Sequence, residues 1–397
     1  MTNPPTPHNS PPLRILMIIS HFAPTIGGAE RQAEQLSRAL MAAGHHVEVL
    51  TLALADMPPE ESLDGLRIHR KLRGIPVGPF WGWTYARSVR RFLMAHKNNF
   101  DLLHAHQLYI HAAVAAAAKK EIGLPVIAKA SSAGISSDFA RLARNRGGKS
   151  WIRQLQNLDR VICVTRQVEE ECRQWGIPPD RCLRIPNFVN TERFNFPRAR
   201  PFPVRRLLFV GRLDHFKAPD HLLEAFAILH TTHPDVTLTL VGGGEEREKL
   251  SRFCAEKNLN RVVHFAGEQK DALPSYKEAD AVIIPSRSEG LCNVLLEALA
   301  AGLPVVATAV GGNPEGLGRE TVDGRLDLPD RGWIEADGGL LCAPGDPAAM
   351  ARAMAALVED SNLAARLSAT GRARAESVYD MKSVVARYQN LYEELTQ

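Results

Sequence analysis

The sequence contains no long hydrophobic run and no marked excess of charge of one sign. Its longest apolar stretches, residues 15–19 and 112–118, fall well short of the ~20 residues that a membrane-spanning helix needs. In a chain of 397 residues, 48 Lys and Arg nearly balance 44 Asp and Glu, which leaves a net charge of only +4. A nucleic-acid-binding protein would show dominant, clustered basic residues. We therefore expect neither a membrane-spanning chain nor a nucleic-acid partner.

Cysteines at metal-binding spacing are also missing. The six cysteines are scattered without a Cys-x-x-Cys pair, so they indicate neither a zinc site nor a disulfide framework. Residues 1–12 are rich in Pro, Asn and Thr, lack the basic and apolar segments of a secretion signal, and are expected to form a disordered tail. No Gly-x-Gly-x-x-Gly follows an expected strand, which argues against a nicotinamide enzyme. A reduced, cytoplasmic compartment is the simplest interpretation.

Short apolar strands alternate with amphipathic helices in both halves of the chain. Strands are expected at residues 13–19, 46–51, 101–105, 125–130, 160–164 and 182–185, and again at 206–210, 235–241, 261–265, 280–284 and 304–308. Helices are expected between them, and three more at 346–358, 361–376 and 381–396. This alternation predicts two α/β domains with doubly wound, Rossmann-like parallel sheets. The pattern stops at residues 197–205, a Pro- and Arg-rich stretch that reads as an interdomain linker.

A glycine followed by two cations stands at the end of the strand at 206–210. Gly211 would let a ligand approach the backbone, and Arg212 and Lys217 would place two positive charges at the mouth of an interdomain cleft. Such side chains bind phosphates well, the arginine through two bonds and the lysine as a compact charge. The alternative is a solvated pair on a surface loop.

A second polar cluster follows the strand at 280–284. Glu289 lies in a loop, Asn293 is a plausible N-cap of the next helix, and Glu297 lies one turn into that helix among leucines. The free amides of the helix start would favour an anionic ligand. The two glutamates could bind different parts of one polyhydroxylated ligand. Alternatively, Glu289 is a solvated loop charge and Glu297 caps a neighbouring strand.

The ordered set of these motifs resembles the family-4 (group 1) retaining glycosyltransferases of GT-B fold. Glu-x7-Glu follows Gly-Arg-Leu-x4-Lys, and Gly302-Leu303-Pro304 and Gly311-Gly312-Asn313 come after it, so that the resemblance spans nearly the whole chain. It implies two domains, 13–196 on the acceptor side and 206–378 on the nucleotide-sugar side, facing each other across a cleft. The segment 379–397 is then expected to cross back and pack on the first domain. The donor would be a nucleotide-diphosphate sugar, with no cofactor.

The resemblance also implies roles for individual residues. Arg212 and Lys217 would hold the donor diphosphate, Glu289 the sugar hydroxyls and Glu297 the ribose hydroxyls. Four backbone amides would lie near the sugar and phosphate, those of Leu291, Cys292, Asn293 and Val294. Gly267 would lie beside the base.

In the first domain, Gly27 and Gly28 match the glycine loop that lies over the donor phosphates, although a plain strand–helix turn is the alternative. His106 matches the histidine near the sugar and acceptor, whereas His104 is expected to be structural. The chain departs from the family pattern at three positions: Phe188, Asn190 and Ala218 stand where Gly, Asp and Gly are usual.

The expected chemistry is front-face transfer with retention at the anomeric carbon, without a metal ion, because no Asp-x-Asp occurs. Two segments suit a saccharide or lipid-linked acceptor of a bacterial surface polysaccharide or glycolipid, or peripheral contact with the inner membrane surface. One is a basic run, Arg141, Arg144, Arg146, Lys149 and Arg153. The other is an aromatic segment, Phe80, Trp81, Trp83 and Tyr85 with Arg87, Arg90 and Arg91. A solvated helix face is the alternative. Competing functions are a nucleotide-sugar epimerase, a glycosyl phosphorylase and a non-catalytic nucleotide-sugar-binding protein.

Overall fold

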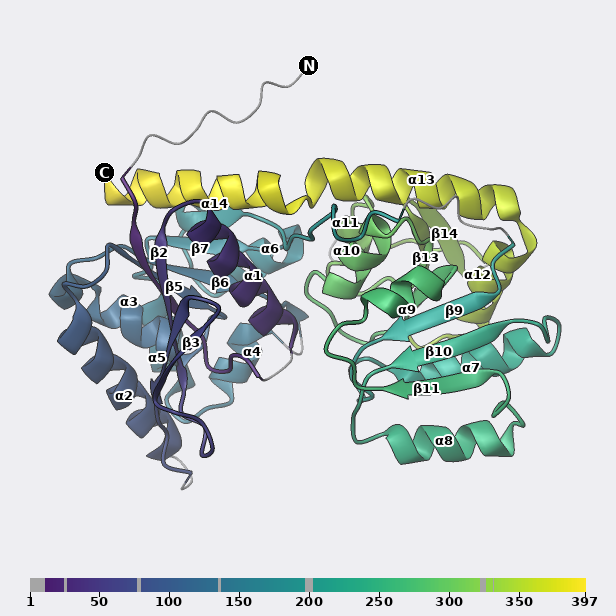
Figure 1. The fold of residues 1–397 in the computed structure, drawn as a ribbon, viewed down its shortest axis with the longest axis horizontal. Helices are drawn as coiled ribbons and strands as arrows, with labels where there is room; N and C mark the ends of the chain where they lie inside the picture. The colour runs from purple at the N-terminus through teal and green to yellow at the C-terminus, as the bar shows by residue number, and fades with distance from the viewer. Residues whose placement is uncertain are drawn as a thin grey trace, which may run out of the picture.

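The computed structural model describes residues 11–24, 27–76, 80–134, 137–196, 203–321, 326–330 and 332–397. Two lobes lie side by side, each built on one largely parallel sheet with helices on both faces (Figure 1). The expected α/β fold of two doubly wound domains is therefore confirmed. Most of the expected tail and linker, residues 1–10 and 197–202, lies outside the described residues.

The first lobe contains an eight-stranded sheet of order β3-β4-β2-β1-β5-β6-β7-β8. Its strands are β1 Arg14–Ile18, β2 His46–Leu52, β3 Glu60–Leu63, β4 Leu66–Leu72, β5 Leu102–His106, β6 Val126–Ala130, β7 Arg160–Cys163 and β8 Cys182–Arg184. All neighbours pair in parallel except β3 and β4. A parallel strand covered on both faces needs apolar side chains in both directions, which explains the unbroken run in β1.

Helices cover both faces of this sheet. They are α1 Gly28–Ala42, α2 Phe80–His96, α3 Ile110–Ile122, α4 Asp138–Ala143, α5 Gly148–Leu155 and α6 Arg166–Gln174. In β1, Ile15 and Met17 face the layer of α1, whereas Leu16 and Ile18 face the layer of α2, α3 and α5. Successive side chains of β1 thus pack alternately against the two helix layers, one on each face of the sheet.

The second lobe repeats this plan with a seven-stranded sheet of order β11-β10-β9-β12-β13-β15-β14. Its strands are β9 Arg206–Val210, β10 Thr237–Val241, β11 Val263–Gly267, β12 Ala281–Ile284, β13 Val305–Thr308, β14 Trp333–Ala336 and β15 Gly339–Cys342. Its helices are α7 Pro219–His230, α8 Arg247–Glu256, α9 Leu273–Glu278, α10 Asn293–Ala300, α11 Asn313–Gly316, α12 Pro347–Glu359 and α13 Ser361–Val378. Helices α7, α8 and α12 cover one face of the sheet, and α9 and α10 the other.

The last helix, α14 (Met381–Thr396), returns to the first lobe. Together α13 and α14 form a long helical run along one edge of the molecule, drawn in yellow in Figure 1. Val189 marks the crossing point, because its amide donates to Tyr379 O (2.9 Å) and its carbonyl accepts from Met381 N (3.0 Å). Beyond it, Tyr388 and Tyr392 are buried in the same cluster as Ile15 and Met17. None of the helices described is both long and apolar enough to pass through a bilayer.

Candidate active site

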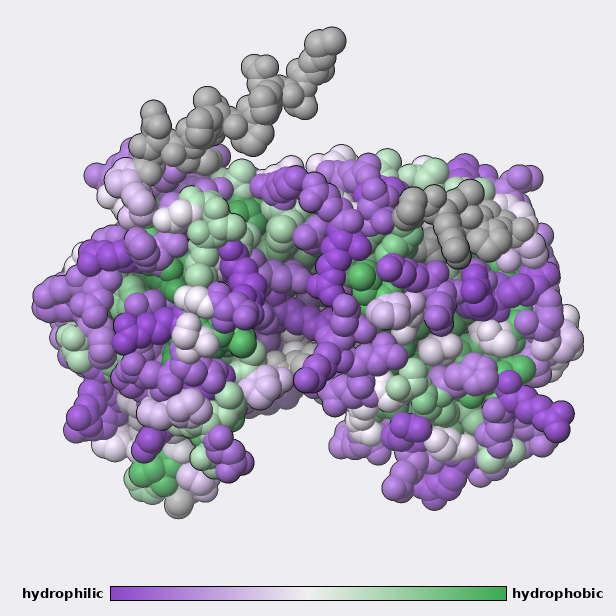
Figure 2. Space-filling view, viewed as in Figure 1, coloured by the Kyte–Doolittle hydropathy of each residue, from purple (hydrophilic) through white to green (hydrophobic). Residues whose placement is uncertain are grey.

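A cleft of about 310 Å³ separates the two lobes. Hydrophilic residues gather where the surface is hollowed between the lobes (Figure 2). His106, Val210 and Val241, at the carboxyl ends of β5, β9 and β10, line it, as expected where two open parallel sheets face each other. Every candidate catalytic or donor-binding residue of the sequence analysis lines this cleft except Gly267, whose neighbours Glu268 and Gln269 line it instead; of the basic run, Arg141 lines it.

The cation and carboxylate of the second lobe form one tight pair. Lys217 Nζ lies 2.6 Å from Glu289 Oε1, and Ser286 Oγ donates to the same oxygen at 2.7 Å. Burial opposes a charge on Lys217, but the carboxylate of Glu289 outweighs it and raises the pKa of the lysine. A positive charge is thus kept inside the cleft at neutral pH. Glu289 is no solvated loop charge, because its side chain is only 8% exposed.

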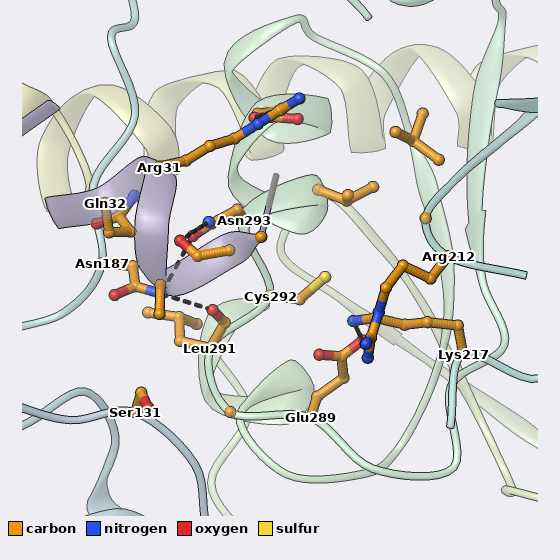
Figure 3. A pocket seen from close by; sticks show the side chains of 18 of the residues that line it. Arg31, Gln32, Ser131, Asn187, Arg212, Lys217, Glu289, Leu291, Cys292 and Asn293 are labelled. Carbon is orange, nitrogen blue, oxygen red and sulfur yellow. Dashed lines mark hydrogen bonds and ion pairs between the residues drawn. The ribbon is translucent and has the colours of Figure 1, made fainter. Parts of the chain in front are cut away.

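Arg212 lies beside this pair and is much more open to solvent. Its guanidinium is 2.9 Å from Asp214 Oδ2, and its side chain is 68% exposed. Asp214 also accepts from the amide of Lys217 at 2.9 Å, which fixes the loop that carries both cations. Figure 3 shows Arg212 and Lys217 on the same side of the cleft as Glu289. Arg212 is therefore free to exchange its exposed ion pair for an anionic ligand.

The departure at Ala218 has a structural consequence. Ala218 is fully buried and has a φ of 51°, in the left-handed region that favours glycine. A Cβ in this conformation costs about 1–2 kcal/mol. The chain thus accepts local strain next to the lysine of the cleft.

Asn293 does not cap α10 with its side chain, contrary to the expectation from the sequence. The N-cap is Cys292, and Asn293 is the first helical residue. The side chain of Asn293 instead reaches the other lobe, where its Nδ2 donates to Gly28 O at 2.9 Å. Asn187 of the first lobe donates to Leu291 O at 2.8 Å and to Asn293 Oδ1 at 3.1 Å (Figure 3). These bonds tie the start of α10 to the first lobe.

Gly290 brings the lobes even closer beside Glu289. Its backbone forms an isolated antiparallel bridge with Ser132, and a Cβ built on Gly290 would lie 1.9 Å from Ser131 O. No side chain fits at this position, which explains the glycine directly after the buried glutamate.

Glu297 faces the cleft from the first turns of α10. Tyr276 Oη donates to its Oε2 at 2.6 Å, and Arg31 Nη1 of the first lobe lies 4.0 Å from its Oε1. Burial raises the pKa of Glu297, although the bond from Tyr276 and the charge of Arg31 act in the opposite direction. Its partners Tyr276 and Arg31 are side chains of helices α9 and α1, so the alternative of a strand cap does not hold.

The two histidines of β5 differ in their surroundings. His104 is fully buried, and its Nδ1 is 2.7 Å from Tyr392 Oη of α14. His106 lines the cleft and stacks on His104, with ring centroids 4.4 Å apart. Burial lowers the pKa of His106 well below its ordinary value, and the neighbouring His104 and Lys129 add to this effect. A neutral imidazole, able to donate or accept one hydrogen bond, therefore faces the cleft.

Several residues that line the cleft were not identified from the sequence. In the first lobe they are Arg31, Gln32, Gln107, Lys129, Ser131, Ser132 and Asn187. Gln32 exchanges two hydrogen bonds with the backbone of Phe188 (2.8 and 3.2 Å), so the departure at Phe188 is accommodated by α1. Of these residues only Lys129 could have been noticed in the sequence, because it is a charged residue in an otherwise apolar strand.

Comparisons with known proteins agree with this architecture. Residues 26–193 match the family model described as Glycosyltransferase Family 4, and residues 192–374 match that of Glycosyl transferases group 1. A D-inositol 3-phosphate glycosyltransferase of Frankia alni is 30% identical, with 88% of this chain and 90% of the relative covered. A glycogen synthase of Mycobacterium tuberculosis is 29% identical, with 96% and 94% covered.

Solved structures share the whole fold. The sucrose-phosphate synthase of Thermosynechococcus elongatus superposes with a TM-score of 0.77 at 25% identity and covers 96% of this chain and 99% of its own. Anabaena HepE, solved with UDP-glucose, gives a TM-score of 0.73 at 19% identity, with 96% and 100% covered. With two adjoining family matches and a relative of nearly equal length at 30% identity, this chain belongs to the family-4, group 1 glycosyltransferases of GT-B fold.

Proposed function

We propose that the protein transfers a hexose from a UDP- or GDP-sugar to a saccharide or lipid-linked acceptor, with retention at the anomeric carbon. One observation carries this proposal: Arg212, Lys217, Glu289 and Glu297 share a single cleft. Two cations for a diphosphate and two carboxylates for hydroxyl groups match the chemistry of such a donor. The UDP-glucose complex of a protein with the same fold supports the choice of ligand class.

The charged groups of the cleft have different roles in this reaction. Lys217, Arg212 and the amides at the start of α10 stabilise the charge that develops on the departing diphosphate. Glu289 accepts hydrogen bonds from sugar hydroxyls while its pairing with Lys217 keeps it in place. The acceptor oxygen bonds to the anomeric carbon on the face that the diphosphate leaves. The proton of the acceptor passes to an oxygen of the leaving phosphate, so that no enzymic nucleophile is required.

We propose domain boundaries at 13–196 and 206–378, with 379–397 completing the first domain, and a cytoplasmic location.

We also propose that no divalent ion takes part in the reaction. The sequence lacks Asp-x-Asp, and in the described ranges no three His, Cys, Asp or Glu side chains converge as metal ligands would. Lys217 and Arg212 supply positive charge in the place where a metal ion could otherwise do so.

Thermal unfolding with a panel of UDP-, GDP- and ADP-sugars tests the donor class. One nucleotide series should raise the melting temperature, because a ligand at 100 times its Kd stabilises the folded state by about 2.7 kcal/mol. The same shift should persist in EDTA. A shift that appears only with added Mn²⁺ would contradict metal independence, and no shift with any nucleotide would contradict the proposed function.

Product analysis with the stabilising donor separates the competing functions. An epimerase would release an epimerised sugar without an acceptor, and a phosphorylase would need inorganic phosphate. A binding protein would leave the donor intact. The proposed transferase would form a glycoside of unchanged anomeric configuration, visible by proton NMR.

The tip of the first lobe suits contact with an anionic membrane surface, which we propose as the source of a lipid-linked acceptor. Ile75, Phe80 and Trp83 are 56%, 60% and 61% exposed there. Next to them lies a groove of about 460 Å³ whose lining includes Trp81, Trp83, Trp151, Arg144 and Arg146. Exposed aromatic rings beside arginines are typical of proteins that rest on anionic headgroups.

Sedimentation with phosphatidylglycerol vesicles tests this surface. The double substitution Phe80→Ser, Trp83→Ser should weaken binding by about 100-fold or more, because each large apolar side chain contributes about 1.5–3 kcal/mol when buried. Ile228→Ser, at a 48% exposed position on α7, serves as the control and should leave binding unchanged. Equal binding of both variants would contradict the proposal.

A further inference from the structure

Lys129 is a buried amine with no hydrogen-bonding or ionic partner for its Nζ among the described residues. It is the fourth residue of β6, is only 4% exposed and lines the cleft. Within the part of the chain that the structure describes, its Nζ has no hydrogen bond and no ion pair; its one recorded contact is the ring of Tyr388, 6.0 Å away. Burying an ammonium group without an anion is costly, and a cation–π contact at this distance offsets only a little of the cost.

Among the described residues, no carboxylate forms an ion pair with Lys129; the buried Asp138 of α4 is bonded instead to Ser131, Ser132 and the amide of Leu108. His104 and His106 flank it from β5, the Tyr388 ring lies over it from α14, and Ile162 pairs with it from β7. Arg141, which lines the same cleft from α4, adds a second cation to this side. Packing alone would be satisfied by an uncharged side chain such as methionine. The amine is therefore better explained by a ligand than by folding.

The donor diphosphate does not account for this amine. Arg212, Lys217 and the start of α10 line the cleft from the second lobe and would already supply the positive charge that a diphosphate needs. Lys129 belongs to the first lobe, at the end of the strand next to His106. Two hydroxyl groups, of Ser131 and Ser132, follow it along the chain and line the cleft as well. Both hydroxyls donate to the carboxylate of Asp138, at 3.3 and 3.5 Å, so Lys129 and Arg141 are the groups of this wall that would bind a phosphate or carboxylate.

We propose that Lys129, assisted by Arg141, binds an anionic group of the acceptor, so that the enzyme selects a phosphorylated or carboxylated saccharide over a neutral one. The proposal rests on the proposed transferase function and specifies the acceptor of the same cleft. Lys129 is then the residue that determines acceptor specificity.

The low pKa of Lys129 should make binding of the anionic group depend on pH. Burial lowers the pKa of Lys129 to about 7, whereas His104 titrates at about 3 and His106 well below its ordinary value. Burial raises the pKa of Tyr388, which stays neutral. Across pH 6–9 these neighbours therefore do not change charge. Because an anion stabilises the protonated amine, binding should take up a proton and should weaken as pH rises above about 7.

Isothermal titration calorimetry tests the proposal on full-length protein saturated with the nucleoside diphosphate that stabilises it most. The probes are inorganic phosphate, glucose 6-phosphate and glucuronate, with glucose as the neutral comparison. We expect at least one anionic probe to bind the wild type, with affinity falling as pH rises from 7 to 9. Lys129→Met should weaken that binding at least tenfold and remove the proton uptake. Lys129→Arg should keep the binding but lose the pH dependence, because a guanidinium stays charged.

Lys120→Met, at an exposed position on α3, is the matched control and should behave as wild type. Lys129→Met should melt no lower than wild type, because a buried charge has been removed. The inference is overturned if no anionic probe binds, or if Lys129→Met binds the probe as wild type does. If no nucleoside diphosphate binds at all, the proposed function itself fails, and the two failures are distinguishable.

Discussion

Lys217→Met should lower kcat by about 10²- to 10³-fold, the cost of removing one preorganised donor that stabilises charge in a transition state. The amine is held 2.6 Å from Glu289, and that carboxylate raises its pKa, so that it is charged and positioned before the donor arrives. The KM for the donor should change much less than kcat, because the charge on the diphosphate grows as the glycosidic bond breaks. Steady-state kinetics with the stabilising donor would measure both constants.

A control is needed because removing Lys217 leaves Glu289 buried without its cation. The double variant Lys217→Met, Glu289→Gln removes both charges and should melt higher than Lys217→Met alone, yet remain as inactive. Lys249→Met, at an exposed position on α8 away from the cleft, should turn over normally. Turnover near the wild-type rate in Lys217→Met would show that this lysine is not part of the chemistry.

Glu297→Gln should raise the KM for the donor about 10- to 100-fold while kcat changes little. A hydrogen bond to a charged group contributes about 1.5–3 kcal/mol, and a carboxylate that accepts from ribose hydroxyls acts equally on the bound donor and the transition state. Tyr276→Phe, which removes the hydroxyl that orients Glu297 at 2.6 Å, should have a smaller effect in the same direction. An unchanged donor KM in Glu297→Gln would remove Glu297 from the donor site.

The pH dependence of this effect has a definite sign. Burial raises the pKa of Glu297, so that the carboxylate gains a proton at a higher pH than an exposed glutamate does. The donor KM of the wild type should therefore rise as pH falls through that pKa, and the inflection should be absent in Glu297→Gln. At neutral pH the variant should melt no lower than wild type, because a group whose folded-state pKa is raised above its unfolded value costs stability once it ionises.

Most strands of both sheets could be predicted from the sequence, including the edge strands β8 and β11, whereas the two antiparallel hairpins could not. Strands such as β1 and β12 are buried on both faces and read as short apolar runs. The β3–β4 hairpin instead contains many charged residues, among them Glu60, Glu61 and the exposed Arg67, which forms an ion pair with Glu60. The β14–β15 hairpin is only four residues long in each strand. Such short antiparallel edges carry little periodic signal.

In the candidate site, most charged residues of the second lobe could be predicted from the sequence, whereas many residues of the first lobe could not. Glu289 and Glu297 could be identified because one loop and one helix supply both at fixed spacing. Lys129, Asn187 and Arg31 lie far apart in the sequence and meet only because the ends of β6, the loop after β8 and the start of α1 converge. The expected cap at Asn293 was wrong because Asn293 is already the first helical residue, and its Oδ1, which a cap would use as acceptor, accepts from Asn187 of the other lobe.

The return of α14 has a consequence for how the molecule is made. Val384, Tyr388 and Tyr392 belong to the same buried cluster as Leu13 and Ile15, so the first and last parts of the chain form one core. During synthesis the ribosome releases these last residues only after the whole second lobe has emerged. The first lobe is therefore completed after the second, and a nascent chain must keep an apolar face of its opening strands uncovered until α14 has emerged.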